Sequence, residues 1–141
     1  MASVQDSVRE HAVVRELVAF LRREGYRVRL EVPNMGQSAD LVATRGRWAM
    51  FVEAKVADWR RALEQCRAHQ QVADFVCVAI ATLTPSASLL GEATRLGYGV
   101  IHCEPDSLRC RWALRPRLNK RVWPPQRRQW AKAIRAVSYA H

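Results

Sequence analysis

The chain has 141 residues, 49% of them hydrophobic, which is enough apolar material for one domain with a packed core. No stretch approaches the roughly 20 apolar residues of a membrane span, and residues 1–10 lack the apolar segment of a secretory signal, so we expect a cytoplasmic protein. The net charge of +10 favours a polyanionic partner, most often nucleic acid, although the charge alone also fits a solvated tail or a contact with an acidic membrane.

The chain begins with a predicted helix over residues 7–24, followed by Gly25 at the C′ position. Its apolar stripe consists of Val13, Leu17, Phe20 and Leu21. Glu10 falls inside this stripe, and Glu16 lies at its margin. For both glutamates a solvated or capping role is the alternative to a functional one.

A strand and a loop are predicted next. Residues 26–32 alternate apolar and polar side chains, the pattern of a half-buried strand. Pro33 is expected to end this strand, because proline cannot donate to a sheet ladder. The polar residues 34–38 are then expected to form a loop that leads into Asp40.

The rest of the chain is organised around the stretch DLVATRGRWAMFVEAK, from Asp40 to Lys55. Two apolar runs separated by a turn at Arg45-Gly46 are typical of a β-hairpin. Side chains alternate along a strand, so Glu53 and Lys55 share a face. With a two- or four-residue loop centred on Arg45-Gly46, Asp40 lies opposite Phe51 and roughly 7 Å or less from Glu53, as its diagonal neighbour. The sequence therefore predicts two carboxylates and an amine side by side.

Burying such a group costs free energy unless a cation offsets the lost hydration. Mg²⁺ takes oxygen ligands, commonly one or two carboxylates, and keeps waters that can attack a phosphate. Lys55 is one of only three lysines among 23 basic residues, which favours a specific role for its compact, tunable ammonium group. The alternative is a structural ion pair between Glu53 and Lys55, with Asp40 capping a turn.

This pattern resembles a known family. Asp40, twelve intervening residues and then Glu53-Ala54-Lys55 is similar to the motif of the PD-(D/E)xK nucleases, with Ala39 in place of the motif's proline. Together with residues 15–26, the hairpin looks most like archaeal-type Holliday-junction resolvases and Mrr-like nucleases, over about residues 7 to 104. The resemblance implies a restriction-endonuclease-like α/β fold. Its core has the order α-β-β-β-α-β, with a mixed sheet flanked by helices.

The resemblance also implies an activity: metal-dependent hydrolysis of DNA phosphodiester bonds that leaves 5′-phosphate and 3′-hydroxyl ends. The implied cofactor is Mg²⁺, for which Mn²⁺ is expected to substitute. Asp40, Glu53 and the carbonyl of Ala54 would be the metal ligands. Lys55 would orient or deprotonate the attacking water and stabilise charge on the phosphate.

Two further residues are carried over from the family. A glutamate on the family's first helix completes the metal site; Val14 stands at its place here, and Glu10, one turn earlier, is expected to substitute, with Glu16 as the alternative. Several branches have a glutamine on the helix after the hairpin, and Gln65 is the match. His69, four residues later, shares a face with Gln65 and could look toward the metal site, but the preferred interpretation is a surface histidine.

The second half of the sequence alternates helices and strands, which predicts a mixed sheet with helices on its faces. The expected elements are a helix from the N-cap Asp58 to about residue 72, a strand over residues 75–81, a helix from Thr84-Pro85 to Gly97, and strands over residues 100–103 and 108–114. The four cysteines lack metal-ligand spacing and are expected to be reduced, with Cys103 and Cys110 able to face each other across a hairpin.

Basic charge is concentrated at the C-terminus. Residues 115–141 contain eight Lys or Arg and no Asp or Glu, whereas residues 1–114 carry 15 basic and 13 acidic residues. We therefore divide the chain into a nuclease-like core, 1–114, and a basic helical extension of the same domain, 115–141. Trp123 or Trp130 could contact bases or sugars, while the apolar side of the last helix could pack on the body or on a second subunit of a homodimer. The residues expected to bind nucleic acid are Arg117, Lys120, Arg121, Arg127, Arg128, Lys132 and Arg135.

Two other functions fit the same sequence. One is a non-catalytic nucleic-acid-binding module that kept the nuclease fold, and the other is an enzyme directed at RNA. The intact set of Asp40, Glu53 and Lys55 favours a DNA endonuclease over the first of these. Four-way junctions, flaps, lesions and recognition sequences all fit as substrates.

Overall fold

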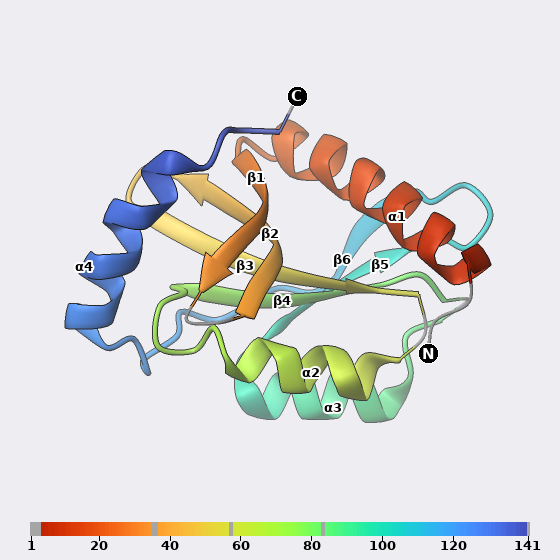
Figure 1. Ribbon diagram of the computed structural model, residues 1–141. Helices are drawn as coiled ribbons and strands as arrows, with labels where there is room; N and C mark the ends of the chain where they lie inside the picture. The colour runs from red at the N-terminus through yellow and green to blue at the C-terminus, as the bar shows by residue number, and fades with distance from the viewer. Residues whose placement is uncertain (1–3, 35–36, 57, 83, 141) are drawn as a thin grey trace.

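The computed structural model describes residues 4–34, 37–56, 58–82 and 84–140. Within these residues, a six-stranded mixed sheet is flanked by helices on both faces (Figure 1), so the predicted α/β class and mixed sheet are confirmed. The elements are α1 (Val4–Arg23), β1 (Arg27–Asn34), β2 (Gln37–Arg45), β3 (Trp48–Lys55), α2 (Trp59–Arg67), β4 (Phe75–Ile80), α3 (Ala87–Leu96), β5 (Gly99–Cys103), β6 (Cys110–Leu114) and α4 (Pro124–Ala133), with a 3₁₀ turn at Ile134–Ala136.

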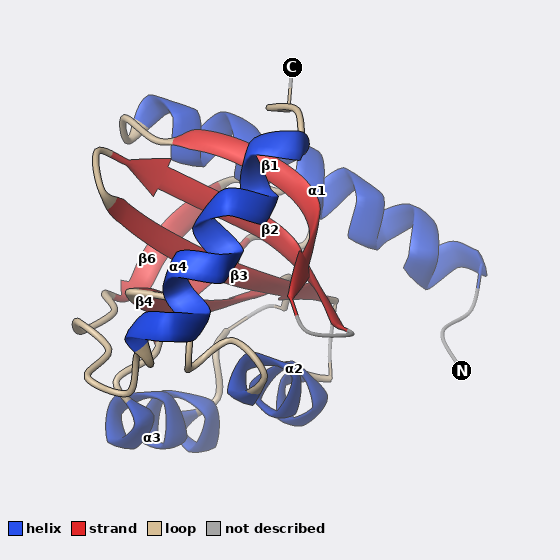
Figure 2. Cartoon of the chain, turned by 60° about the vertical axis from the view of Figure 1, so that its left-hand side comes forward, coloured by secondary structure: helices blue, strands red, loops and turns tan. Residues whose placement is uncertain are grey.

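The strands lie in the sheet in chain order, β1 to β6. Strands β1, β2 and β3 are antiparallel neighbours, whereas β3, β4 and β5 are parallel to one another, and β6 is antiparallel to β5. Parallel neighbours need a crossover connection, and α2 and α3 provide the two crossovers. Helix α1 covers one face of the sheet, and α2, α3 and α4 lie on the other (Figure 2).

Side-chain alternation divides the core into two layers. Phe51 of β3 packs in the layer beneath α2, α3 and α4. Its neighbours Met50 and Val52 pack in the other layer, against α1. The apolar stripe predicted for α1 is confirmed, since its four side chains are at most 9% exposed. The central strand β3 is therefore covered on both faces, and a polar side chain placed on it is removed from water.

The β2–β3 hairpin decides how the candidate site residues face one another. Arg45 pairs with Trp48, so the loop is the two residues Gly46-Arg47, and Gly46 has the positive φ of +59° that such a turn favours. The loop was predicted at Arg45-Gly46, and that prediction is therefore wrong by one residue. As a result, the residue of β3 that lies opposite Asp40 is two positions later than predicted. Because side chains alternate with a period of two, the shift preserves the shared face and brings Asp40 opposite Glu53 instead of diagonal to it.

Three other boundaries differ from the prediction. Pro33 does not end β1: it pairs with Ser38, as an edge strand permits, so part of the predicted loop is strand, while residues 35–36 lie outside the described residues. Helix α2 has the predicted N-cap, Asp58, but ends at Arg67. Helix α3 begins after Ser86, whose hydroxyl accepts a hydrogen bond from Leu89 N–H (3.1 Å), and not at Thr84-Pro85.

The C-terminal segment is part of the folded body. Trp130 and Ile134 are only 6% and 7% exposed, and the ring of Trp130 lies 5.1 Å from that of Phe51. The segment is also held by backbone hydrogen bonds from Asn119 to Asp74 (2.7 Å), from Trp123 to Gln71 (2.8 Å) and from Ala140 to Val28 (2.7 Å). The apolar side of α4 is thus docked on the body, and Trp130 is too buried to contact a base. Removing this segment would expose the core, so its binding role must be tested with point substitutions.

The four cysteines are free and buried. Cys103 and Cys110 pair across the β5–β6 hairpin with their Sγ atoms 3.1 Å apart, as the sequence suggested. Among the described helices, none combines the length and apolar character needed to cross a membrane.

Candidate active site

Asp40 and Glu53 come from neighbouring strands, and their carboxyl groups interact. Asp40 Oδ2 accepts a hydrogen bond from Ala54 N–H (2.9 Å), which ties the Asp40 side chain to β3. Burial, the negative charge of Glu53 and a hydrogen bond with Glu53 together raise the pKa of Asp40 from 3.8 to about 6. The Ala54 N–H and the positive charge of Lys55 act in the opposite direction. The hydrogen bond from a protonated Asp40 lowers the pKa of Glu53 in turn, so the pair holds one negative charge more readily than two.

Glu53 is held by a buried chain of hydrogen bonds that begins at the end of β1. Glu53 and His69 are 2% and 0% exposed, and Glu53 Oε1 lies 2.7 Å from His69 Nε2. Asn34 Nδ2 lies 3.1 Å from His69 Nδ1 and also donates to the Ala68 carbonyl (3.0 Å). An amide nitrogen can only donate, so His69 Nδ1 accepts, and its Nε2–H must donate to Glu53.

The contact between His69 and Glu53 has the geometry of an ion pair, but His69 is not charged in it. Burial lowers the pKa of His69 to about 4, which leaves the ring neutral near pH 7. Burial also raises the pKa of Glu53. The contact is therefore best described as a hydrogen bond from a neutral imidazole, which fixes the Glu53 carboxyl group without cancelling its charge.

The interpretation of His69 as a surface residue is wrong. That interpretation assumed that the helix continued to about residue 72, but α2 ends at Arg67. The turn that follows, with a hydrogen bond from His69 N–H to the Cys66 carbonyl (3.0 Å), carries the ring inward. Asn34, predicted as a loop residue, is likewise buried, at 3% exposure. A polar residue that directly follows the alternating strand pattern was the one sequence feature that could have indicated a buried, hydrogen-bonded Asn34.

Lys55 ends β3, two residues after Glu53, and is half-buried. Its positive charge lowers the pKa of both Asp40 and Glu53. The predicted set of two carboxylates and one amine is therefore brought together at the carboxyl end of a strand with a parallel neighbour, a frequent position for ligand sites in α/β sheets.

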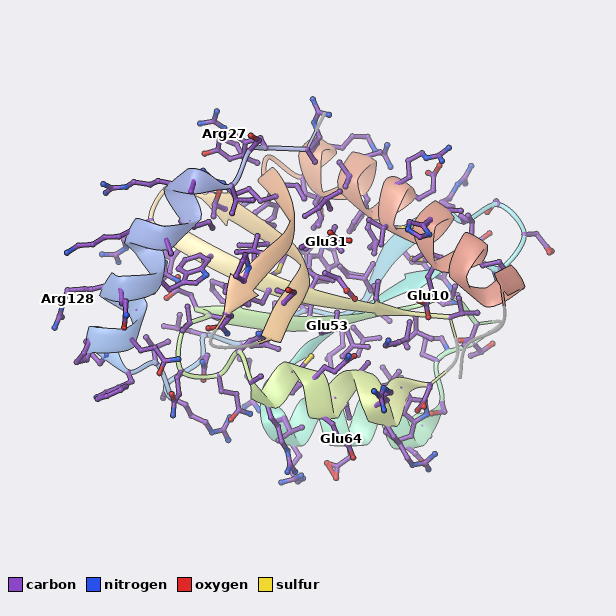
Figure 3. All side chains as sticks on the ribbon, viewed as in Figure 1. Glu10, Arg27, Glu31, Glu53, Glu64 and Arg128 are labelled. Atoms are coloured by element: carbon purple, nitrogen blue, oxygen red, sulfur yellow. The ribbon has the colours of Figure 1, made fainter. Side chains whose placement is uncertain are left out.

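A cavity of about 260 Å³ opens beside Asp40, between α1 and strands β1 to β3. It is lined by Glu10, His11, Val14, Leu30, Glu31, Asp40 and Ala54. Figure 3 shows Glu10 projecting from α1 and Glu31 from β1. Of the two candidate glutamates on α1, Glu10 shares the cavity with Asp40, whereas the charge of Glu16 acts on Cys103 and Cys110.

Glu31 is an acidic residue that the sequence placed among outward-facing strand residues. The ladder pairs Leu30 with Leu41 and Val32 with Ala39, so Glu31 lies opposite Asp40. Its backbone has φ +51°, in the left-handed region that residues other than glycine seldom adopt. Such backbone strain concentrates at functional sites, and here it lies on the wall of the Asp40 cavity.

The donor set suits one kind of metal better than another. Among the described residues, no group of three or more His, Cys, Asp or Glu side chains is arranged to hold a metal ion, so a cation at this site would have two carboxylates at most. Mg²⁺ is commonly held by one or two carboxylates and completes its shell with waters and substrate phosphates. The Asp40–Glu53 pair meets that requirement. Burial and the charge of Glu53 raise the pKa of Asp40, and a bound cation would oppose both effects.

Gln65 lies on α2, one turn before His69, and is half-buried. Its Oε1 has no hydrogen-bond partner in the described part of the chain. Gln65 is not among the residues that line the Asp40 cavity. The prediction that Gln65 lies beside the carboxylates is therefore supported only by its position on α2, and no described contact joins it to Asp40 or Glu53.

The predicted nucleic-acid-binding residues lie away from the carboxylate pair. Arg128 on α4 is at the opposite end of the molecule from Glu10 (Figure 3). Three of the predicted arginines bind the protein itself: Arg117 the Thr94 carbonyl (2.6 Å), Arg121 the Leu96 carbonyl (3.5 Å) and Arg127 the Asp74 carboxylate (3.1 Å). Arg117 and Arg121 are nevertheless exposed, as are the other four residues: Lys120, Arg128, Lys132 and Arg135.

The comparisons with known proteins support the fold but give no information about function. No family model matches the sequence, and the comparison with curated proteins gives no significant match. Among solved structures, the chain is similar to the SPO1766 protein of unknown function from Silicibacter pomeroyi, with a TM-score of 0.65 and 14% sequence identity. That similarity covers 86% of this chain and 80% of the other, so the α/β architecture is shared over most of both.

Two substitutions at His69 should show how much of its contribution to stability comes from its hydrogen bonds and how much from the space that the ring fills. His69→Leu leaves the Glu53 carboxyl and the Asn34 amide without their partner, and we expect it to lower the free energy of unfolding by about 2–4 kcal/mol. His69→Gln can still donate to Glu53 and accept from Asn34, so it should cost only about half as much. Urea denaturation of both variants checks this. Equal losses would contradict the hydrogen-bonding role.

Proposed function

We propose that the chain is a cytoplasmic, Mg²⁺-dependent DNA endonuclease of the PD-(D/E)xK type. The observation that carries the proposal is the pairing of two buried carboxyl groups, Asp40 and Glu53, beside Lys55, where burial and the charge of Glu53 raise the pKa of Asp40 to about 6. A helix followed by three antiparallel strands, a helix and a parallel strand is also the order that the family implies. An electrostatically costly site in a cavity is a recurrent property of catalytic centres.

Each residue of this site has a distinct role in the proposed reaction. Asp40, Glu53 and the Ala54 carbonyl would hold a divalent cation, which supplies an activated water and neutralises phosphate charge when bound. Lys55 would orient the attacking water and stabilise the charge that develops on the phosphate. His69 keeps the Glu53 carboxyl in one orientation by donating to its Oε1. Glu10, which lines the same cavity as Asp40, would contact a water in that space.

The test is a cleavage panel with Mg²⁺ over linear, nicked, flapped and four-way junction DNA. We expect cleavage that EDTA abolishes and that Asp40→Asn reduces by at least about 100-fold, the scale of a lost electrostatic contribution. Junction-selective, symmetric cuts would identify a resolvase. Failure of the wild type to cut any of these DNAs in Mg²⁺ or Mn²⁺ would overturn the proposal.

A non-catalytic nucleic-acid-binding module is the second candidate. The burial of Glu53, at 2% exposure, and its hydrogen bond to His69 favour it, because one carboxylate oxygen is already engaged within the protein. In that case the chain should bind the same DNA panel without cutting it. Asp40→Asn should then leave binding unchanged with or without Mg²⁺.

A further inference from the structure

The two tryptophans of the C-terminal segment have opposite environments. Trp130 is 6% exposed and packs in the core, whereas Trp123 is 56% exposed, the most exposed large apolar side chain among the described residues. Leu118, in the same segment, is 48% exposed. The structure thus buries one of the two candidate contact residues and leaves the indole of Trp123 accessible to a partner.

Trp123 adjoins a cavity of about 450 Å³. It lies in the chain between Arg121 and Gln126, both of which line this cavity, and its backbone N–H donates to the carbonyl of Gln71, a third lining residue (2.8 Å). Arg67, from the end of α2, lines it as well. Trp123 is not itself a lining residue, but its backbone is bound next to a cavity that carries two arginines, Arg67 and Arg121.

A second cavity, of about 410 Å³, shares Arg121 with the first. Its other cationic lining residues are Arg95, Arg117 and Lys120, and Leu118 also lines it. Neither cavity has an acidic lining residue within the described chain. Glu92 pairs with the lining Arg95 (2.8 Å) and so compensates its charge, whereas Asp74 pairs with Arg127 (3.1 Å), which lines neither cavity. Together the two cavities, here called the hollow, carry the positive charge of Arg67, Arg117, Lys120 and Arg121 with no acidic lining residue among the described residues, next to the segment that carries Trp123.

The second cavity of this hollow lies at the opposite end of the parallel strands from the candidate active site, whereas the first is lined by Asn34, the residue that binds His69. Val76, at the start of β4, and Gly97, just before β5, line the second cavity. Lys55 pairs with Ile80, at the end of β4. With a rise of about 3.3 Å per residue, the two places are separated by roughly 10–15 Å along the sheet. A polynucleotide can span that distance, so one substrate could occupy both.

We propose that this hollow binds an unpaired stretch of DNA, with phosphates in the two basic cavities and a base stacked on Trp123. Aromatic side chains that stack on bases within a basic groove are the usual means of binding single strands. Bases of an intact duplex already stack on each other, so the indole selects unpaired nucleotides. The inference rests on the proposed nuclease function and narrows its substrate class to DNA with a single-stranded segment, such as a flap.

The experiment measures equilibrium binding of a fluorescently labelled oligo(dT) in EDTA by anisotropy, alongside a labelled duplex. Trp123→Ala should weaken oligo(dT) binding about tenfold, the scale of one base stack, and should leave duplex binding nearly unchanged. Trp123→Phe should retain most of the affinity because it keeps an aromatic face. Arg121→Ala should reduce the salt dependence of binding, by about 0.7 in the log–log slope for each phosphate that the protein no longer neutralises.

The matched controls lie outside the hollow. Trp48 is 36% exposed and packs on Phe75, which belongs to the layer beneath α1, so Trp48→Ala should leave oligo(dT) binding unchanged. Arg22, at the end of α1, is the arginine control. Equal effects of Trp123→Ala and Trp48→Ala, or no effect of Trp123→Ala and Arg121→Ala, would overturn the inference. Because these measurements use EDTA, their outcome is independent of whether the chain cuts DNA.

Discussion

Lys55→Arg is expected to lower single-turnover cleavage in Mg²⁺ by about 100-fold or more, the size of a lost acid–base or electrostatic contribution. The substitution keeps the positive charge but replaces a compact, tunable ammonium with a larger and permanently protonated fork. Lys55 is half-buried beside both carboxyl groups and lowers the pKa of each, so a misplaced charge there acts directly on them. DNA affinity measured in Ca²⁺ should change little, because one cation replaces another.

The chain offers a close control for this experiment. Lys132 is an exposed lysine on α4, and Lys132→Arg should leave cleavage at the wild-type rate. If Lys55 were only half of a structural ion pair with Glu53, arginine would serve nearly as well, and cleavage by the Lys55→Arg variant would survive. Thermal unfolding of both variants must stay close to that of the wild type, which separates a loss of chemistry from a loss of folding.

The hairpin that carries the candidate site was predictable because the features that define it, two alternating strands and a short turn, all lie within one stretch of 16 residues, Asp40 to Lys55. Side chains alternate between the two faces along β2 and β3. A shift of two residues in the β2–β3 register therefore leaves Asp40 and Glu53 on the same face. The prediction that Asp40 and Glu53 meet therefore survived an error in the position of the turn. A one-residue shift in pairing would have separated them.

The surroundings of the site could not be read from the sequence in the same way. His69 faces Glu53 because α2 ends at Arg67 and the chain then turns inward, and helix ends are set by packing as much as by propensity. Asn34 joins them from a strand that precedes His69 by 35 residues. No periodicity links these positions, so the buried chain of hydrogen bonds emerges only when the three segments are in place.

Charge illustrates a second limit of the sequence. Counting residues located the basic excess in residues 115–141. It did not show that Arg127 is used to bind Asp74, or that Arg67, from α2, lines the same cavity as Arg121. The basic surface is built from distant parts of the chain, whereas composition assigns charge only to segments.

Asp40→Asn is expected to stabilise the metal-free protein at neutral pH while it removes cleavage. The folded-state pKa of Asp40 is raised from 3.8 to about 6, so the folded protein binds this proton more tightly than the unfolded chain does. The contribution of Asp40 to the free energy of unfolding is therefore most favourable below pH 3.8. It falls as the pH rises toward about 6, where Asp40 becomes charged in the folded protein. One pKa unit corresponds to about 1.4 kcal/mol, and because Asp40 keeps some contact with water, we expect asparagine to recover about 1–2 kcal/mol above pH 6.

The pH dependence and the response to Mg²⁺ identify the cause of this stabilisation. In EDTA, the difference in unfolding free energy between Asp40→Asn and the wild type should be near zero below about pH 4 and reach a plateau above about pH 6. Added Mg²⁺ at about 100 times its dissociation constant should stabilise the wild type by about 2.7 kcal/mol and leave the variant unaffected. Urea denaturation across pH, with and without Mg²⁺, measures all of these quantities. A variant that is less stable than the wild type at pH 7 in EDTA, or a wild type that ignores Mg²⁺, would show that the carboxylate pair is a structural contact and not a cation site.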